Sequence, residues 1–403
     1  MMVRSLRSFA TAAFLALVIV GTAPLARAEG VRPEVGKPLQ AASALIKQKK
    51  GREAMAEIAK AEAVGNRTAY ENQVIAQMKA AAASSAGDAD ATIKANEALL
   101  ESGKVSGRES ITLVQSVAVA YYNKKDYANA AKWTQRYFKE GGSDPAMRTM
   151  LLQSHYLQGD CAAVDRSVNE NKASETELQM LQDCYRRKGD HAGYVKAMEA
   201  LVANYPKKEY WTILVTNVQK KPGFSDRLAA DVYRLKLATG NLNSAADYME
   251  FAQLALQQGV PAEAKEIMDK GYATGVLGKG DEAARQGRLR DLINKALADS
   301  QAKRAQDEKD AVAAKDGGDL VKLGLNNVYE GKADQGFRQI EQGIKKGGLK
   351  RPEDAKLRLG EAQLHAGRKE AAVRTLREVK SNDPKVNDGT ADIARLWVLY
   401  ARA

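Results

Sequence analysis

The sequence predicts an all-α fold in which about ten helix pairs stack into an α-solenoid that ends in a C-terminal capping helix. A tight basic, glycine or aspartate turn recurs between helical patterns, with most intervals between 30 and 38 residues. Alternation of β-branched residues is absent over any useful length. Prolines fall mostly between the helical patterns, where the missing N–H costs least. A period of this length is typical of stacked helix pairs, each of which buries its apolar face only against its neighbours.

The turn inside each helix pair gives the order of the elements. We place it near Gly51, Gly87, Lys125, Gly159, Gly189, Pro222, Gly259, Gly331 and Gly367. The interval from residue 259 to residue 331 is two periods, so a degenerate pair is expected there, with helices over 281–300 and 301–315. The last segment, residues 390–400, carries apolar residues on one helical face. We expect it to pack as a lid over the final pair.

A glycine-rich stretch, residues 271–280, is the predicted place of a kink or partial break in the array. Residues 29–273 are then expected to form N-terminal repeats, and residues 274–403 a smaller set of C-terminal repeats with the capping helix. A single continuous solenoid with one long loop is the alternative. Neither part has the composition of a disordered linker.

Residues 1–28 are typical of a signal peptide that is removed on export. Arg4 and Arg7 precede a short apolar run, and Ala26-Arg27-Ala28 has the pattern of a cleavage site. The run is shorter than the about 20 residues that a membrane-spanning helix needs. Loss of these three arginines would change the net charge from +12 (62 basic minus 50 acidic residues) to +9. We therefore expect a periplasmic protein without a transmembrane segment.

The chain carries no recognisable catalytic or ligand-binding motif. Zinc spacings, a G-x-S-x-G elbow and a complete phosphate loop are all missing. His155 is expected to pack in the core, and His191 and His365 to lie on the surface. Basic and acidic residues alternate along the helices, which indicates solvated faces rather than a nucleic-acid-binding surface. We therefore predict that the protein is not an enzyme and uses no cofactor, metal or nucleic acid.

The two cysteines, Cys161 and Cys184, are expected to form a structural disulfide. An even number of cysteines in an oxidising compartment favours pairing. The repeat register puts Cys161 at the start of the second helix of one pair and Cys184 late in the first helix of the next. Those helix ends lie close together in a stacked array. The C-x-x-C spacing typical of a redox-active pair is absent.

Residues 111–145 resemble a tetratricopeptide repeat. That family has a small residue and an aromatic near the end of the first helix, Gly-Asp-Tyr at the turn, a small residue in the second helix and a closing proline. The corresponding residues here are Ala120, Tyr121, Lys125, Asp126, Tyr127, Ala130 and Pro145. Weaker copies follow at 154–164 and 184–194. The resemblance implies a concave groove lined by the first helix of each pair.

Mapped through this register, ten residues are candidates for the groove. They are Gln115, Tyr122, Asn123, Thr149, Gln153, Tyr156, Gln179, Asp183, Arg186 and Arg187. The Lys and Asn of the family's carboxylate clamp are absent from the corresponding positions, which argues against binding of a terminal carboxylate. Glutamine, asparagine and tyrosine suit hydrogen bonding to an extended peptide or a partner helix. The alternative is that each is an ordinary solvated helix residue.

The resemblance implies a scaffold or adaptor that binds one or more envelope proteins or peptides along the groove. Family members in that compartment serve outer-membrane assembly, secretion, pilus biogenesis or TonB-type uptake, and the sequence does not choose among these. The alternative function is binding of a non-protein envelope polymer such as peptidoglycan or polysaccharide. The basic charge balance and the groove tyrosines suggest this alternative.

Overall fold

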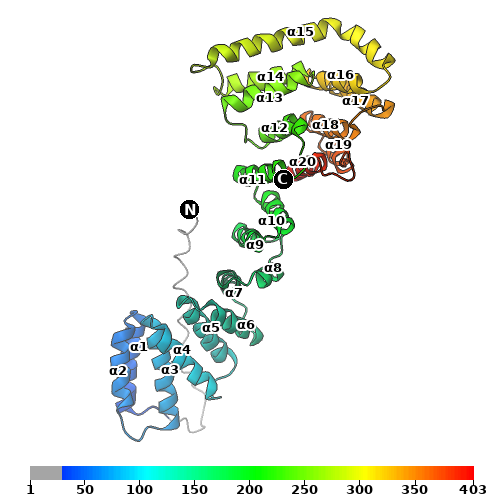
Figure 1. Ribbon diagram of the computed structural model, residues 1–403. Helices are drawn as coiled ribbons and strands as arrows, with labels where there is room; N and C mark the ends of the chain where they lie inside the picture. Colours follow the sequence, from blue (N-terminus) through cyan, green and yellow to red (C-terminus); the bar gives the residue numbers. More distant parts are fainter. Residues whose placement is uncertain (1–29) are drawn as a thin grey trace. The chain divides into compact units, whose positions relative to one another are not determined.

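The computed structural model describes residues 30–403, so the predicted signal peptide lies outside the described residues. Within this range the chain is helical, and its one extended pairing is an isolated bridge between Asp383 and Val386. The predicted all-α repeat fold is confirmed (Figure 1). The helices form two compact units, one ending at Gln158 and one running from Gly159 to Ala403. Each unit is described by itself.

The first unit contains seven helices within the described residues. They are α1 (Pro33–Lys47), α2 (Gly51–Glu62), α3 (Ala69–Ser85), α4 (Ala89–Glu101), α5 (Gly107–Asn123), α6 (Tyr127–Lys139) and α7 (Pro145–Gln158). Each helix packs on the next along the chain, as serial stacking requires.

The second unit begins with four helices and a short 3₁₀ turn: α8 (Cys161–Ser167), α9 (Glu175–Lys188), α10 (His191–Asn204), α11 (Lys208–Gln219) and η1 (Asp226–Leu228). Its middle part contains α12 (Ala229–Ala238), α13 (Ala245–Gln257), α14 (Pro261–Ala273) and α15 (Ala283–Ala313). It ends with α16 (Gly318–Tyr329), α17 (Ala333–Lys346), α18 (Pro352–His365), α19 (Lys369–Arg377) and α20 (Thr390–Arg402).

The recurring turns pair a residue of positive φ with an aspartate that caps the next helix. The three pairs are Lys125–Asp126, Gly159–Asp160 and Gly189–Asp190, with φ of 64°, 85° and 70° at the first residue of each. The aspartate carboxylates accept hydrogen bonds of 3.1, 3.0 and 2.9 Å from the backbone N–H three residues further on. Such a cap satisfies a helix N–H that has no partner within the helix. These local features explain the recurrence seen in the sequence.

In the first unit, the buried Glu71 ties the start of the described chain to α3. Its carboxylate accepts hydrogen bonds of 2.9 Å from the Nε and Nη2 atoms of Arg32 and of 2.9 Å from the backbone N–H of Thr68. The Thr68 hydroxyl in turn accepts from the Glu71 backbone N–H at 3.1 Å, which completes a capping box. Chiefly because of the hydrogen bond from Arg32, the pKa of Glu71 is lowered to about 2.

We expect Glu71→Gln to weaken the acid dependence of the first unit's stability. A carboxylate with a lowered pKa stabilises the fold above its ordinary pKa of 4.5, and this contribution is lost as the pH falls toward about 2. The variant should therefore melt at a lower temperature than the wild type at neutral pH, and the difference should shrink across this interval. Thermal unfolding at a series of pH values measures it. The exposed Glu53→Gln serves as control, and parallel curves for wild type and Glu71→Gln would contradict the prediction.

The second unit closes on itself. Its largest core combines residues of α9–α12 with residues of α18–α20, including Leu357, Leu376, Ile393 and Trp397. Helix α20 lies over α18 and α19, as predicted for the lid, and it also contacts α10, α11 and α12 (Figure 1). The last repeats therefore pack against repeats that precede them by well over a hundred residues, in addition to their serial neighbours.

A polar cluster around Arg227 of η1 stabilises this closure. The Arg227 guanidinium donates to Asp354 at the start of α18 (2.8 and 3.0 Å) and to Asp388 before α20 (2.6 Å). Arg227 also donates to the hydroxyl of Thr390 at 3.0 Å. Burial works to raise the pKa of Asp388, but hydrogen bonds from Thr390, Asn382 and Arg227 hold it well below its usual range. The Asp388 carboxylate therefore stays ionised and remains paired with Arg227.

The degenerate helix pair predicted over 281–315 is wrong, because one helix of 31 residues, α15, occupies this segment. No glycine or proline occurs between residues 288 and 313, and Ser300 continues the helix at the predicted break. α15 packs on α14 and also contacts α13 and α16 (Figure 1). The division predicted after residue 273 falls between α14 and α15, inside the second unit.

Helices α16 and α17 cross with their backbones in contact. Two glycines on each helix, seven residues apart, face each other: Gly317 and Gly324 of α16 with its cap, and Gly336 and Gly343 of α17. A Cβ on Gly324 would lie 2.5 Å from the Gly336 carbonyl oxygen, and a Cβ on Gly336 would lie 2.5 Å from that of Gly324. No side chain fits at this crossing without moving the backbone.

We expect Gly324→Ala to destabilise the second unit by about 1–3 kcal/mol, because the added methyl overpacks a backbone contact. Gly287→Ala in α15 is the matched control, since its Cβ would meet nothing within 4 Å. The control should be neutral or more stable by up to about 1 kcal/mol, because alanine is the better helix former. Denaturant unfolding of the two variants measures the contrast. Equal shifts in the same direction would overturn the prediction.

Candidate functional site

The groove positions predicted on α5 and α7 form a polar face within the first unit. The Tyr122 hydroxyl donates to Gln153 Oε1 at 2.9 Å, so the structure brings these two predicted residues together. Gln115 Nε2 donates to Asp144 Oδ2 at 3.3 Å. Gln153 is only 7% exposed, so its carbonyl oxygen serves to orient the tyrosine. This face is polar and its side chains are held in fixed orientations.

The other predicted residues of α5 and α7 are more accessible. Asn123 and Thr149 are exposed, and Tyr156 is half-buried. The half-buried Tyr122 ring packs edge-on against Tyr127, with ring centroids 5.5 Å apart. Asn123 and Thr149 are thus the most accessible predicted side chains of this face.

The positions predicted on α9 belong to the second unit. Gln179 Nε2 donates to the Tyr210 hydroxyl at 2.7 Å, and this hydroxyl donates to the Glu175 carboxylate. Burial and the hydrogen bond to Glu175 raise the pKa of Tyr210 to about 12, so the phenol stays protonated. Lys207 Nζ lies 2.6 Å from Glu175 Oε1. The face therefore extends from α9 onto α11.

At the C-terminal end of α9, Asp183 stands between two exposed arginines. Arg186 Nε donates to Asp183 Oδ1 at 3.1 Å, and Arg187 Nη2 lies 2.6 Å from Asp183 Oδ2. The three side chains therefore carry one net positive charge together. Arginines in the last turn also interact favourably with the helix dipole.

Sequence reasoning missed Tyr210, Glu175 and Asp144 as members of these faces. Tyr210 lies on α11, a first helix for which the repeat pattern was too weak to map groove positions. Asp144 precedes α7 in a connection between helices. A spacing of about one repeat separates Gln179 from Tyr210 and Tyr122 from Gln153, 31 residues in each case. That recurrence is a signal that could have found the partner residues.

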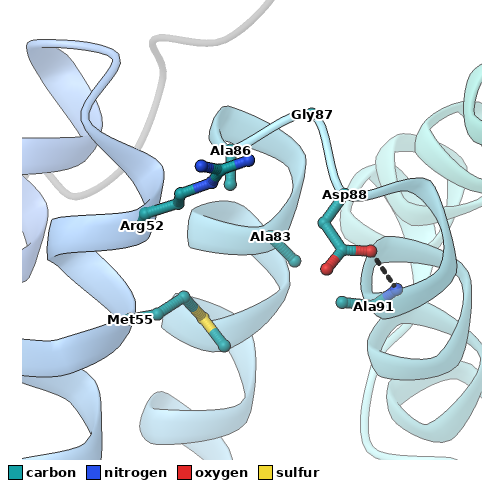
Figure 2. A pocket seen from close by; sticks show the side chains of 7 residues that line it. All are labelled: Arg52, Met55, Ala83, Ala86, Gly87, Asp88 and Ala91. Atoms are coloured by element: carbon teal, nitrogen blue, oxygen red, sulfur yellow. Dashed lines mark hydrogen bonds between the residues drawn. The ribbon is translucent and has the colours of Figure 1, made fainter.

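A small pocket of about 340 Å³ lies between α2, α3 and the start of α4. Figure 2 shows Arg52 and Met55 on α2 facing Asp88 and Ala91, with Ala83 of α3 between them. The Asp88 carboxylate caps α4 through a 3.0 Å hydrogen bond from the Ala91 N–H. The exposed Arg52 brings a positive charge to the opposite rim. The sequence did not predict this pocket, whose lining is mostly small residues.

Neither a metal-binding group nor a membrane-spanning helix is found among residues 30–403. Among residues 30–403, no group of three or more His, Cys, Asp or Glu side chains is arranged to hold a metal ion. In the same part of the chain, no helix combines the length and the apolar character needed to cross a membrane.

Two stretches of the chain match a known protein family. Residues 183–208, covering the end of α9 and α10, and residues 354–385, covering α18, α19 and the loop after them, match the tetratricopeptide repeat family. The second unit therefore contains segments that match tetratricopeptide repeats, in agreement with the resemblance. No curated protein sequence matches it significantly.

Two solved structures align with most of this chain. The structure of Naa15/Naa10 bound to HypK-THB aligns with a TM-score of 0.36 and 14% identity over 87% of this chain and 54% of that chain. The present chain thus spans little more than half the length of that protein. The crystal structure of yeast Tom70 aligns with a TM-score of 0.26 and 12% identity, over 91% of this chain and 95% of that chain.

Proposed function

We propose that this protein is a non-enzymatic adaptor of the bacterial cell envelope that holds a partner protein or peptide on the polar faces of its first helices. The tetratricopeptide-repeat fold is that of a protein–protein interaction scaffold. The observation that supports the site best is the repeated hydrogen-bonded pair at one-repeat spacing, Tyr122 with Gln153 and Gln179 with Tyr210. These pairs fix the faces in advance, which lowers the entropy lost on binding.

Two features support the envelope location. The first 28 residues have the pattern of a signal peptide. The disulfide between Cys161 and Cys184 is of a kind that persists in oxidising compartments such as the periplasm. The outward side chains, amides, hydroxyls and the Arg186–Arg187 pair, suit an extended peptide or a polar helix with acidic groups.

Site-specific photocrosslinking tests the proposal. A photoreactive residue at Thr149, which is exposed on α7, is expected to capture an envelope protein in intact cells. Gln135, which is exposed on the second helix α6, is the matched control. Capture at Thr149 but not at Gln135 supports the adaptor. Equal capture at both positions, or none at either, counts against the polar faces as the binding site.

Sedimentation with purified sacculi separates this function from the alternative of polymer binding. An adaptor for proteins is expected to stay in the supernatant. Co-sedimentation that is lost on digestion of the peptidoglycan would favour the polymer binder instead. The hydroxyl of Tyr122, one of the groove tyrosines that suggested that alternative, is engaged within the fold, where it donates to Gln153.

A further inference from the structure

Four buried charged side chains and one partly exposed arginine, Arg358, from three helices meet in the second unit. They are Asp231 and Arg234 of α12, Glu263 of α14, and Arg358 and Glu361 of α18. The Arg234 guanidinium lies at the centre. Its Nε and Nη2 atoms donate to Glu263 at 2.6 and 2.7 Å, and its Nη1 donates to Asp231 at 2.5 Å and to Glu361 at 3.1 Å.

Neutral groups complete the shell of this buried cluster. The Trp397 indole N–H of α20 donates to Glu361 Oε1 at 2.8 Å. The Tyr329 hydroxyl of α16 donates to Glu263 Oε1, also at 2.8 Å. Gln258, which follows α13, accepts from Arg234 at 3.1 Å. The cluster therefore touches α12, α14, α16, α18 and α20, three of which (α12, α18 and α20) take part in the closure of the second unit.

The charges of the buried cluster do not balance when every group is ionised. Three carboxylates face two guanidiniums, which leaves one negative charge in excess. Asp231 Oδ2 is also buried without a hydrogen-bond partner, although the same residue accepts from Arg234 and Arg358 through Oδ1. A buried oxygen without a donor and a buried unpaired charge each cost free energy. One proton on the cluster removes both costs.

The acid–base behaviour of the two nearest carboxyls agrees with this count. Burial and the negative charge of Asp231 raise the pKa of Glu361 well above its ordinary value. Burial also works to raise the pKa of Asp231, but Arg358 and Arg234 hold it below its ordinary value. Glu361 is therefore the group that carries the proton, and Asp231 the group that accepts the hydrogen bond from it.

We propose that the closed second unit binds one proton between Glu361 and Asp231, and that release of this proton to solvent at raised pH opens the contact between α18 and α12. The closed state then holds one proton more than the open state. Its stabilisation is complete below the ordinary pKa of glutamate and is lost as the pH rises through the raised one. While the proton is being released, the closing equilibrium constant falls about tenfold per pH unit.

Other charged and titratable groups surround the pair formed by Glu361 and Asp231. Arg234 keeps its charge, because its carboxylate partners outweigh the effect of burial and raise its pKa well above the ordinary value. Burial and the charge of Glu263 hold the pKa of Tyr329 far above its ordinary value, so the phenol stays neutral. His365 of α18 lies 4.5 Å from the Tyr329 ring and 3.3 Å from Glu266 of α14. A separate variant of His365 distinguishes this contact from the buried cluster.

Infrared spectroscopy of the folded protein detects the proton directly, because a protonated buried carboxyl has a C=O stretch distinct from that of a carboxylate. The wild type should show this band at neutral pH and lose it at raised pH. Amide hydrogen exchange in α12 and α18, corrected for the intrinsic effect of pH, should accelerate over the same interval. Glu361→Gln should lack the band and keep its slow exchange across that interval, because the amide is neutral at every pH.

The controls separate the buried cluster from its surroundings. Glu370→Gln, an exposed carboxyl on α19, and His365→Gln should both keep the wild-type band and the wild-type exchange profile. If Glu361→Gln fails to fold, Asp231→Asn provides the second test. It removes the excess negative charge that favours the protonated form of Glu361, so the band should be weakened or lost at neutral pH. Absence of the band in wild type at neutral pH overturns the proposal. An exchange profile of Glu361→Gln that follows the wild type also overturns it.

Discussion

Replacement of Arg234 with methionine is expected to destabilise the second unit by about 3–5 kcal/mol, because it leaves several buried carboxylates without their cation. Arg234 is 6% exposed, and its single guanidinium pairs with three carboxylates, those of Asp231, Glu263 and Glu361. The methionine side chain fills a similar volume, so the loss reports on charge rather than on a cavity. Chemical denaturation followed by circular dichroism measures it, with the transition of the second unit as the readout.

Arg368→Met is the matched control for Arg234. Its partner Asp334 lies 3.4 Å away, and both side chains are largely exposed. A surface pair of this kind contributes about 0–1 kcal/mol. A loss at Arg234 no larger than the loss at Arg368 would show that the buried cluster does not hold the second unit closed.

Removal of the disulfide is expected to cost about 3 kcal/mol, the second large effect. Cys161 and Cys184 are 23 residues apart in sequence, and their Cα atoms lie 5.3 Å apart. The bond joins α8, a helix of only seven residues, to the side of α9. Without it the unfolded chain gains loop entropy. Unfolding of the oxidised protein, the reduced protein and the Cys161→Ala/Cys184→Ala variant measures the difference.

The reduced protein and the double alanine variant should agree within error, and a reductant should leave the variant unchanged. Both comparisons separate the bond from the packing of the cysteine side chains, which are nearly fully buried. Identical unfolding of the oxidised and the reduced protein would contradict the prediction. So would a stabilising effect of the alanine substitutions.

The repeat architecture could be predicted because its determinants are local. Gly159 and Gly189 supply the positive φ of a tight turn, and the aspartate after each caps the next helix. The spacing of such turns fixes where helices begin and end, whatever their neighbours do. The disulfide followed from the same register. The single helix α15 was missed because the expected period outweighed the absence of any turn residue near Ser300.

The closure of the second unit could not be predicted, because its determinants lie far apart in sequence. Arg234 and Glu361 are separated by 127 residues and stand in helices rich in charged residues. From the sequence alone, a buried charge looks the same as a solvated one. The glycine pairs Gly317–Gly324 and Gly336–Gly343 were a usable signal, since a seven-residue spacing puts both glycines of a pair on one helix face.

The candidate faces were predicted only in part. The residues on α5, α7 and α9 were identified through the repeat register, and the structure shows Tyr122 and Gln153 in contact. Which of them bind a partner is still a prediction. Their hydrogen-bond partners Tyr210 and Asp144 escaped because they lie outside the mapped helices. A register identifies equivalent positions, but the side chains that meet across repeats depend on how neighbouring pairs are packed.

The position of α20 has a consequence for biosynthesis. An open array can fold from its N-terminus as each helix pair leaves the ribosome, since every pair needs only the one before it. Here α10, α11 and α12 find part of their apolar cover in α20, a helix that is translated more than 150 residues later. When these helices leave the ribosome, the apolar surface that α20 later covers is still exposed to solvent. During translation the nascent chain therefore presents a hydrophobic face that chaperones would recognise, until α20 covers it.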